Sequence, residues 1–212
     1  MQLYGYWRSS AAYRVRIVMH LKGVEFESIP VHLVKDGGQQ HSESFGDLNP
    51  NHLVPTLVDG ELVLNQSLAI IEYLDRKYPN KPVIPSELNL QAQVRALAYD
   101  VACEIHPINN LRVQQYLEKD LSVSADEKLE WSHHWMSKGF AAIERKLAKT
   151  SNNFCFGNDV TLADICLVPQ VYNANRFNVD MVPYPRINQI VDNCNHLSAF
   201  KKALPENQPD AQ

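Results

Sequence analysis

The sequence predicts a chain in two parts, an α/β part over residues 1–82 and an all-helical part over residues 91–212. In the first part, short apolar runs alternate with helical patterns in the order βαβαββα. In the second part, we find no alternating run that predicts a strand. A proline-rich break at residues 79–85 separates the parts, and residues 83–90 are expected to form the linker.

The first elements predict a unit of strand, helix and strand. Leu3–Tyr6 is a short apolar run, and the helix after it should end at Lys22–Gly23, where glycine can adopt the left-handed backbone conformation. The residues Ile29, Val31 and Leu33 then alternate along the chain, which is typical of a strand with one buried face. This order begins a right-handed parallel unit.

A hairpin and a helix are expected to complete the first part. After a short helix near residues 44–48, two apolar runs flank Asp59–Gly60, which is a strong hairpin signal. Pro55 lies at the start of the first of these strands and cannot donate a ladder hydrogen bond, so it should lie at a sheet edge or in a special turn. The closing helix has an apolar stripe formed by Leu68, Ile70, Ile71 and Leu74.

The second part contains several helix signals. A long helical pattern covers residues 88–117, and Pro107 should kink or break it. Ser124–Glu127 fits a capping box and predicts the start of a second long helix. Thr161–Asp164 is a further capping box, before a helix that is apolar nearly all round and should be buried. Shorter helices near residues 186–193 and 199–204 should precede a polar, loose tail from Pro205.

Composition and charge exclude several classes of function. The chain is 45% hydrophobic and 21% charged, with a net charge of −4 and no basic cluster, so nucleic acid is not an expected partner. No apolar stretch approaches the roughly 20 residues of a membrane helix. The chain starts with a strand pattern and not with a targeting segment. We therefore expect a cytoplasmic protein with no membrane partner.

The four cysteines predict no metal site. They form no CxxC pair, and their spacings fit neither a zinc site nor a disulfide framework. We expect all four to be reduced and structural, because free cysteine commonly behaves as a small buried hydrophobe. They are Cys103, Cys155, Cys166 and Cys194, of which Cys103 and Cys166 lie in apolar helical patterns.

The segment Trp7–Ile17 carries the strongest chemical signal. Arg8 precedes Ser9 and Ser10 at the expected start of the first helix. Two serines at a helix start usually indicate only capping. The free N–H groups and the dipole of a helix start favour an anion, however, and Arg8 adds a fixed positive charge beside them. The segment therefore predicts an anion site.

Motifs across nearly the whole chain resemble the cytosolic glutathione transferases. The general resemblance rests on Val54–Pro55, Gln66–Ser67 and the Thr161–Asp164 box. The resemblance to the zeta class rests on Arg8–Ser10, Arg14–Ile17 and residues 35–40, 65–74 and 167–171. It implies the glutathione transferase architecture, in which a thioredoxin-like domain precedes an all-α domain, and it implies a homodimer.

The resemblance implies glutathione as the cofactor. In the family, backbone groups ahead of a cis proline pair with the tripeptide, which points to Val54 and Pro55. Gln66 and Ser67 lie at a helix start that suits the γ-glutamyl carboxylate, although alone they would indicate simple capping. The residues expected to contact glutathione are Ser9, Ser10, Ala11, Gln40, Val54, Pro55, Gln66, Ser67, His106 and Asn110.

The resemblance also implies that Arg8, Ser9 and Ser10 are catalytic. A free thiol has a pKa of about 8.5, and a helix N-terminus with hydroxyl donors favours its thiolate. We expect the Ser9 hydroxyl to hold the thiolate, assisted by Ser10 and by the amides of Ala11 and Ala12. The zeta pattern usually has cysteine where this chain has Ala11, so no protein thiol takes part at this turn.

Five residues are expected to bind the substrate. Arginine suits carboxylates and a developing oxyanion because it pairs with them through two hydrogen bonds. We expect Pro107 to open its helix so that the polar residues around it face one cleft, with His106 and Asn110 on a common face. A lone helical histidine is more often a core or surface residue. The expected substrate residues are Arg8, His106, Asn110, Arg112 and Arg176.

The function implied by the resemblance is a glutathione-dependent cis–trans isomerase that acts by reversible thiolate addition. The Ser9–Ser10 pair favours conversion of maleylacetoacetate to fumarylacetoacetate, while the His106 cluster favours maleylpyruvate as the substrate. A transferase acting on small halo-acids and a non-catalytic glutathione-binding protein remain as alternatives. Arg8, Ser9 and Arg176 together disfavour the last, because a pure binding protein needs no substrate clamp.

Overall fold

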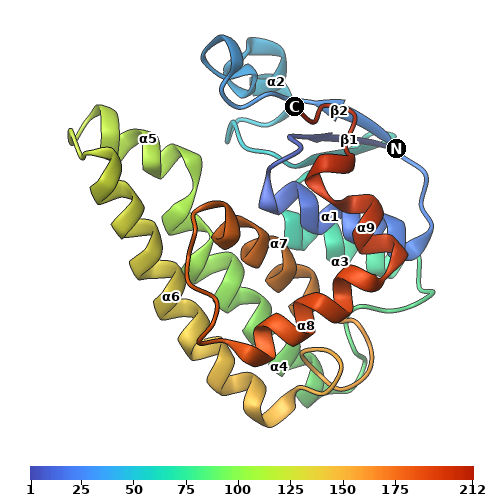
Figure 1. The fold of residues 1–212 in the computed structure, drawn as a ribbon. Coiled ribbons are helices and arrows are strands. Elements are labelled where there is room, and N and C mark those ends of the chain that lie inside the picture. The colour runs from blue at the N-terminus through green and yellow to red at the C-terminus, as the bar shows by residue number, and fades with distance from the viewer. The chain divides into compact units, whose positions relative to one another are not determined.

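The computed structural model describes all 212 residues, and the chain forms two compact units (Figure 1). The first unit comprises Met1–Pro82 together with His196–Gln212, and the second comprises Val83–Asn195. The last 17 residues, which we expected to belong to the helical domain, thus group with the first unit. They leave the helices of the second unit because the last helix packs on the first helix of the chain.

A four-stranded mixed sheet organises the first unit. Its order is β2-β1-β3-β4, with β1 parallel to β2 and antiparallel to β3, and with β3 and β4 joined as the predicted hairpin. The strand expected from the Ile29–Leu33 alternation ends early, because the chain leaves the sheet at Val31. The strands are β1 (Gln2–Gly5), β2 (Glu27–Pro30), β3 (Thr56–Asp59) and β4 (Leu62–Asn65).

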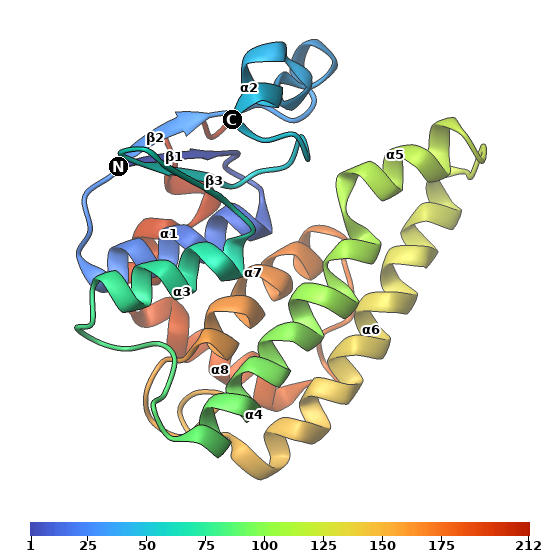
Figure 2. The same cartoon turned by 180° about the vertical axis from the view of Figure 1, so that it is seen from behind.

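Helices cover both faces of this sheet (Figure 2). In both views α1, α3 and α9 lie on one side of the strands and α2 lies on the other. Gly23 ends α1 with a left-handed φ of 68°, as predicted. The helices are α1 (Ser10–Lys22), α2 (Glu43–Leu48), α3 (Ser67–Lys77) and α9 (Ser198–Ala203), with 3₁₀ turns at Lys35–Gly37, Gln39–His41 and Pro205–Asn207.

The second unit is all-helical, and its long helical pattern is interrupted where proline predicts it. A π-helical segment Asp100–Ile105 and a 3₁₀ turn Pro107–Asn109 separate its first two helices. Proline 107 has no N–H to donate, and the wider turn before it is closed by the His106 N–H on the Val101 carbonyl at 2.9 Å. The helices are α4 (Leu88–Tyr99), α5 (Leu111–Lys119), α6 (Ala125–Thr150), α7 (Leu162–Arg176) and α8 (Pro185–His196).

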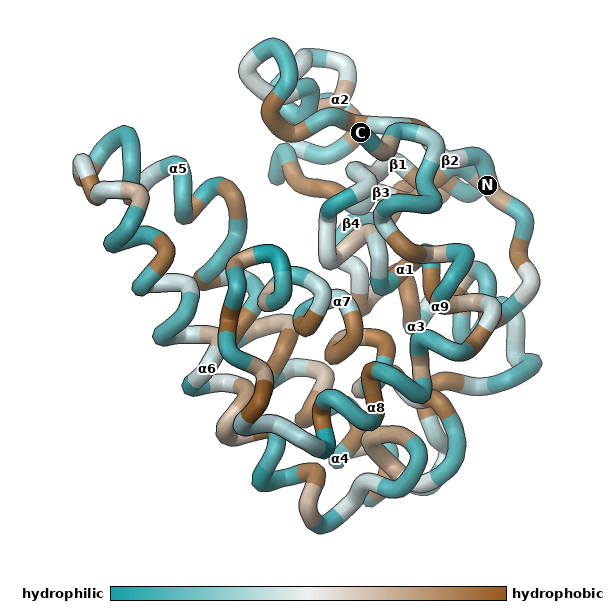
Figure 3. The backbone as a smooth tube through the Cα atoms, viewed as in Figure 1, coloured by the Kyte–Doolittle hydropathy of each residue, from teal (hydrophilic) through white to brown (hydrophobic).

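Both predicted capping boxes are present. Ser124 and Glu127 cap α6 reciprocally, and Thr161 and Asp164 do the same for α7. Helix α7 forms the core of the second unit, since most of its residues are buried and its trace is largely apolar (Figure 3). The second box therefore fixes the start of the most buried helix in this unit.

Two expectations about side chains are corrected. Cys103 is exposed, because it lies on the outer side of the π-helical segment, whereas the other three cysteines are buried; all four are free. The tail from Pro205 is not loose. It forms a 3₁₀ turn, and its side-chain amides donate to two carbonyls of α9 and to that of Leu204, which follows α9. No helix has the length and apolar character needed to cross a membrane.

Candidate functional site

Ser9 caps the first helix, and its hydroxyl proton remains available as a hydrogen-bond donor. Its backbone is extended (φ −67°, ψ 116°), and its Oγ accepts from the Ala12 N–H at 3.2 Å. A hydroxyl that accepts one bond still has its own proton to donate. Ser9 and Ala11 are partly exposed, whereas Ser10 is buried. Of the two serines, Ser9 is thus the one whose hydroxyl can meet a ligand from solvent.

Arg8 lies on an aromatic surface beside this cap. Its guanidinium carbon is 4.2 Å from the centre of the Trp7 ring, which is within the range of a cation–π contact. The Arg8 Nε atom is buried and has no hydrogen-bond partner within the chain. Trp7 is itself buried, so stacking on its ring restricts the positions that the guanidinium of Arg8 can occupy.

The predicted cis proline is present. The Val54–Pro55 peptide bond is cis, and Pro55 lies just before β3 and not within a ladder, which is the special turn that its missing N–H requires. The loop is held by Asn49, whose Nδ2 donates to the Leu53 carbonyl at 2.7 Å and to the Thr56 hydroxyl at 3.1 Å. Asn49 was not expected to matter from the sequence, where it reads as part of a loop.

Gln66 begins α3 in an unusual conformation. Its φ is 68°, in the left-handed region that favours glycine, and its side chain makes no capping bond. The simple capping interpretation of Gln66–Ser67 is therefore wrong. A strained non-glycine residue of this kind costs about 1–3 kcal/mol and is commonly found at functional sites. Gln66 is exposed and Ser67 is buried, so the strained residue is the accessible one.

Arg14 contacts a residue that we expected to bind glutathione, although Arg14 itself was not among the expected site residues. Its Nη1 donates to the Ser67 Oγ at 3.3 Å, which links α1 to the first residue of α3. The side chain is only 2% exposed. Its position four residues before Val18, on the buried face of the helix, was the available signal, because a buried arginine needs partners.

Strand register brings three predicted segments to one end of the sheet. Tyr4 pairs with Thr56, and Thr56 pairs with Asn65. The chain therefore leaves the sheet at the same end towards Ser9, arrives there from Pro55, and leaves there again towards Gln66. Together with the Arg14–Ser67 bond, this register places the helix starts of α1 and α3 and the cis proline turn beside one another.

Gln40 is buried in the first unit and only partly paired. Its Nε2 donates to the Leu33 carbonyl at 3.2 Å, while its Oε1 is buried with no partner. Its own carbonyl contacts Nδ1 of His52 at 2.8 Å. A Cβ atom at Gly38 would lie 2.5 Å from the Gln40 amide, so only glycine allows this side chain to stay where it is.

The remaining predicted residues belong to the second unit. His106 is half-buried and lies between the π-helical segment and the 3₁₀ turn. Asn110 has an extended backbone (ψ 150°), and its side chain caps α5 by accepting from the Arg112 N–H at 3.2 Å. The expected common helical face of His106 and Asn110 is therefore wrong, because no continuous helix joins them. Arg112 and Arg176 are exposed, and Arg176 ends α7.

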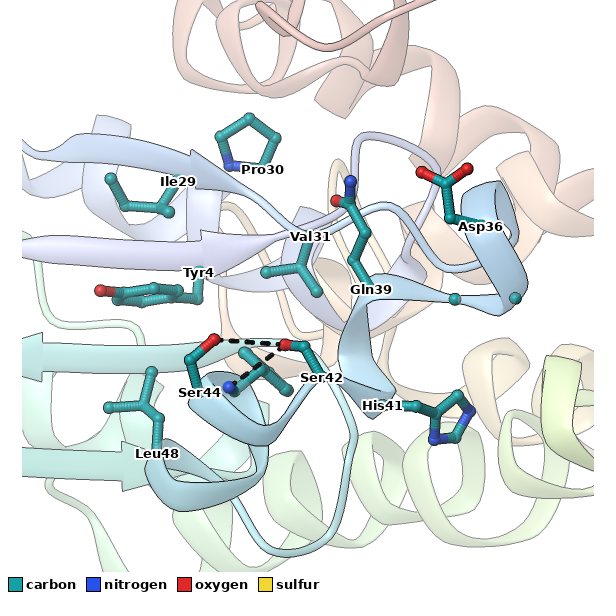
Figure 4. A pocket seen from close by; sticks show the side chains of 13 residues that line it. Tyr4, Ile29, Pro30, Val31, Asp36, Gln39, His41, Ser42, Ser44 and Leu48 are labelled. Carbon is teal, nitrogen blue, oxygen red and sulfur yellow. Dashed lines mark hydrogen bonds between the residues drawn. The ribbon is translucent and has the colours of Figure 1, made fainter.

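A hollow of about 720 Å³ lies elsewhere on the first unit, between the sheet and α2 (Figure 4). Tyr4 and Ile29 from the strands and Phe45 and Leu48 from α2 give it apolar walls, while Ser42 and Ser44 lie at its rim and bond to each other at 3.4 Å. None of the predicted site residues lines it.

The comparisons with known proteins agree on one family. Residues 1–76 match the N-terminal domain of glutathione S-transferase, and residues 108–209 match its C-terminal domain. A protein named probable maleylacetoacetate isomerase from Vibrio cholerae is 56% identical over 209 residues, covering 99% of this chain and 97% of its own.

Two solved structures are similar over their whole length. A maleyl pyruvate isomerase described as a bacterial zeta-class glutathione S-transferase superposes with a TM-score of 0.97 at 44% identity, covering 100% of both chains. A maleylacetoacetate isomerase from Methylobacterium extorquens AM1, with bound malonate and glutathione, superposes with a TM-score of 0.96 at 35% identity, again covering 100% of both chains.

Proposed function

Because the chain belongs to the glutathione transferase family and to its zeta class, we propose that it is a glutathione-dependent isomerase that converts maleylacetoacetate to fumarylacetoacetate. The observation that carries this proposal is the strand register, which gathers the Ser9 cap, the Val54–Pro55 turn and the Gln66 helix start at one sheet end. These are the elements that a bound tripeptide thiol needs.

The residues of the first unit fit glutathione. The N–H and C=O of Val54 have no partner within the chain and can pair with the cysteinyl backbone as an added strand would. The start of α3 at Gln66–Ser67 suits the γ-glutamyl carboxylate, because its free N–H groups carry partial positive charge. Gln40 is also expected to contact the tripeptide, and its Oε1 has no partner within the chain.

Bound glutathione supplies a thiolate that can add to and leave a conjugated double bond, so that rotation about the bond becomes possible. Ser9 donates its hydroxyl proton to that sulfur, and the N-terminus of α1 favours the negative charge. Arg8 then holds a substrate carboxylate or the oxygen on which charge develops. Ser10 is buried, and we propose that it assists Ser9.

In the second unit, we propose that Arg112, Arg176 and His106 bind the diacid. Arg176 and Arg112 are exposed cations at the ends of α7 and α5, and His106 is half-buried beside Pro107. The 56% identity to a probable maleylacetoacetate isomerase favours that substrate, against 44% for the maleylpyruvate isomerase of Ralstonia. Maleylpyruvate therefore stays the second candidate substrate, and transfer of glutathione to small halo-acids the third candidate activity.

We also propose a homodimer in the cytoplasm. Strand β4 is an edge of the sheet and exposes Leu62 and Val63, an apolar edge that isolated proteins usually protect. The four free cysteines suit a compartment that keeps thiols reduced. A mass in solution near twice 24.1 kDa, measured by light scattering, would support the dimer.

The experiment is an isomerisation assay with each substrate. The diketo absorbance of maleylacetoacetate or maleylpyruvate is followed with glutathione, with S-methylglutathione, and with neither. We expect isomerisation of maleylacetoacetate only when the free thiol is present. Faster turnover of maleylpyruvate than of maleylacetoacetate would make maleylpyruvate the substrate. If neither compound were isomerised in a thiol-dependent way, the proposed function would be wrong.

A further inference from the structure

The C-terminal tail reaches the turn that carries Arg8 and Ser9. The backbone N–H of Trp7 donates to Oδ2 of Asp210 at 3.0 Å, across 203 residues of sequence. Trp7 directly precedes Arg8, which stacks on its ring. The turn formed by residues 6–9 is called the catalytic turn below.

A buried arginine holds the same turn from its other side. Arg16 donates from Nη2 to the Trp7 carbonyl at 2.9 Å and from Nη1 to the Tyr6 carbonyl at 3.5 Å. Its Nε donates to the carbonyl of Ala203, the last residue of α9, at 3.2 Å. The Ser9 N–H also donates to the Tyr6 carbonyl, at 2.9 Å. One guanidinium thus joins the catalytic turn to the C-terminal helix.

The course of the tail between α9 and Asp210 is fixed by its own side chains. Gln208 donates from Nε2 to the Leu204 carbonyl at 2.7 Å and to the Lys202 carbonyl at 3.0 Å. Asn207 donates to the Lys201 carbonyl at 2.7 Å, and Pro205 is buried. These bonds satisfy carbonyls at the end of α9 and direct the chain back to the sheet, where Figure 1 places the C-terminus.

We propose that Asp210 and Arg16 are positioning residues that lock the catalytic turn through the C-terminal tail. Both backbone polar groups of Trp7 are then occupied, its N–H by Asp210 and its C=O by Arg16. With its backbone fixed on both sides, Trp7 presents a fixed ring to Arg8, and Ser9 keeps its capping geometry. This proposal rests on the proposed function for its effect on turnover, but not for its effect on the turn itself.

The bond to a carboxylate also decides where an anion can bind. The Trp7 N–H points to Asp210 and is not offered to a ligand, and the negative charge there disfavours a second anion. The N–H groups at the start of α1 therefore remain the favoured place for a thiolate. Loss of Asp210 would remove both effects, so that the turn loosens and a competing donor appears beside Ser9.

The test compares Asp210→Ala, Asp210→Asn and a chain ending at Pro209 with the natural protein. A chain lacking only Gln212, which is exposed, is the matched control. We expect kcat to fall about 10-fold in Asp210→Ala and in the truncated chain, because small displacements of reacting groups cost large factors in rate. Asp210→Asn keeps an acceptor for the Trp7 N–H and should recover part of the loss.

Three readouts separate positioning from stability and from the proposed function. The thiolate absorbance of bound glutathione should titrate at higher pH in Asp210→Ala than in Asp210→Asn, because both variants lack the carboxylate charge and only Asp210→Asn keeps an acceptor that holds the turn. S-methylglutathione, which lacks the thiol, should bind both variants as it binds the natural protein. Hydrogen exchange at the Trp7 amide should accelerate. Unchanged exchange at the Trp7 amide in Asp210→Ala, together with equal thiolate titrations in Asp210→Ala and Asp210→Asn, would overturn the proposal. If the natural protein isomerises neither substrate, the proposed function fails, and these two readouts still decide the role of the tail.

Discussion

The guanidinium of Arg14 and the hydroxyl of Ser67 are joined across 53 residues, with Nη1 donating to Oγ at 3.3 Å. Both side chains are buried; Arg14 lies one turn into α1, and Ser67 is the first residue of α3. The bond therefore sets the spacing between two helix N-termini that we propose hold different ends of glutathione. A change at either residue should affect tripeptide binding more than the chemical step.

We expect Arg14→Ala to raise KM for glutathione about 10-fold and to lower the free energy of unfolding by about 2–4 kcal/mol, because a buried polar contact is lost and a cavity is left. Arg14→Lys keeps a positive charge without the planar guanidinium. Its KM for glutathione and its stability should lie between those of the natural protein and of Arg14→Ala. Steady-state kinetics and urea unfolding measure both effects. Arg145→Ala removes an exposed arginine that donates to the Ala141 carbonyl, and should change neither.

A double-mutant cycle isolates the bond itself. The coupling energy between Arg14→Ala and Ser67→Ala should be about 0.5–3 kcal/mol in unfolding, as for residues in direct contact. Additive effects on KM and on stability would show that the two residues act separately.

Ser9 has two roles that substitution can separate. Ser9→Ala removes the helix cap and the hydroxyl, and should lower stability by about 1 kcal/mol. Ser9→Gly also removes the hydroxyl but costs only a few tenths of a kcal/mol as a cap, roughly. We expect kcat of the two variants to fall equally, by about 100-fold, while their melting temperatures differ. If kcat fell more in Ser9→Ala than in Ser9→Gly, in parallel with the melting temperatures, the Ser9 hydroxyl would act only as a helix cap.

Local sequence signals predicted most of the fold. The Asp59–Gly60 hairpin, the helix end at Gly23 and the box at Thr161 each depend on a few adjacent residues, and each is present. The signal at Pro107 predicted a broken helix but not what replaces it. Whether proline gives a kink or a π-helical segment depends on packing around α4 and α6, which sequence spacing does not encode.

Contacts between distant segments could not be predicted from the sequence. The tail was expected to be loose because it is polar, yet Gln208 and Asp210 find partners on α9 and on Trp7. The strain at Gln66 was also missed, since glutamine has no preference for a positive φ and only the surrounding strands impose it. The parts of the site that consist of adjacent residues could be predicted from the sequence. The single contacts that join distant segments could not.

The conformation of Gln66 predicts a trade between stability and binding. Gln66→Gly should raise the free energy of unfolding by about 1 kcal/mol, because glycine adopts a φ of 68° without steric cost. It should also raise KM for glutathione, since the side chain beside the helix start is lost. Gln66→Asn tolerates the same backbone and is the control for side-chain length. A glycine variant with normal KM would remove Gln66 from the binding site.

The two capping boxes should respond to pH in opposite directions. Burial raises the pKa of Asp164 above its ordinary value, although the Cys155 N–H and Thr161 N–H and hydroxyl bond to it at 2.8 Å each. The folded protein then holds this proton more tightly than the unfolded chain. The contribution of Asp164 to stability is complete below its unfolded pKa and is lost as pH rises through the folded one.

The pKa of Glu127 is shifted in the opposite direction to that of Asp164. Bonds from the side chain and the backbone N–H of Ser124 hold the pKa of Glu127 below its usual value, so its contribution is present above the unfolded pKa and is lost as pH falls. We therefore expect the stability difference between the natural protein and Asp164→Asn to shrink as pH rises above the ordinary aspartate pKa of about 3.9. The stability difference for Glu127→Gln should shrink as pH falls below the ordinary glutamate pKa of about 4.3. Urea unfolding at each pH measures both slopes. A slope for Asp164 parallel to that for Glu127 would mean that the three hydrogen bonds to Asp164 outweigh its burial and lower its pKa in the folded protein.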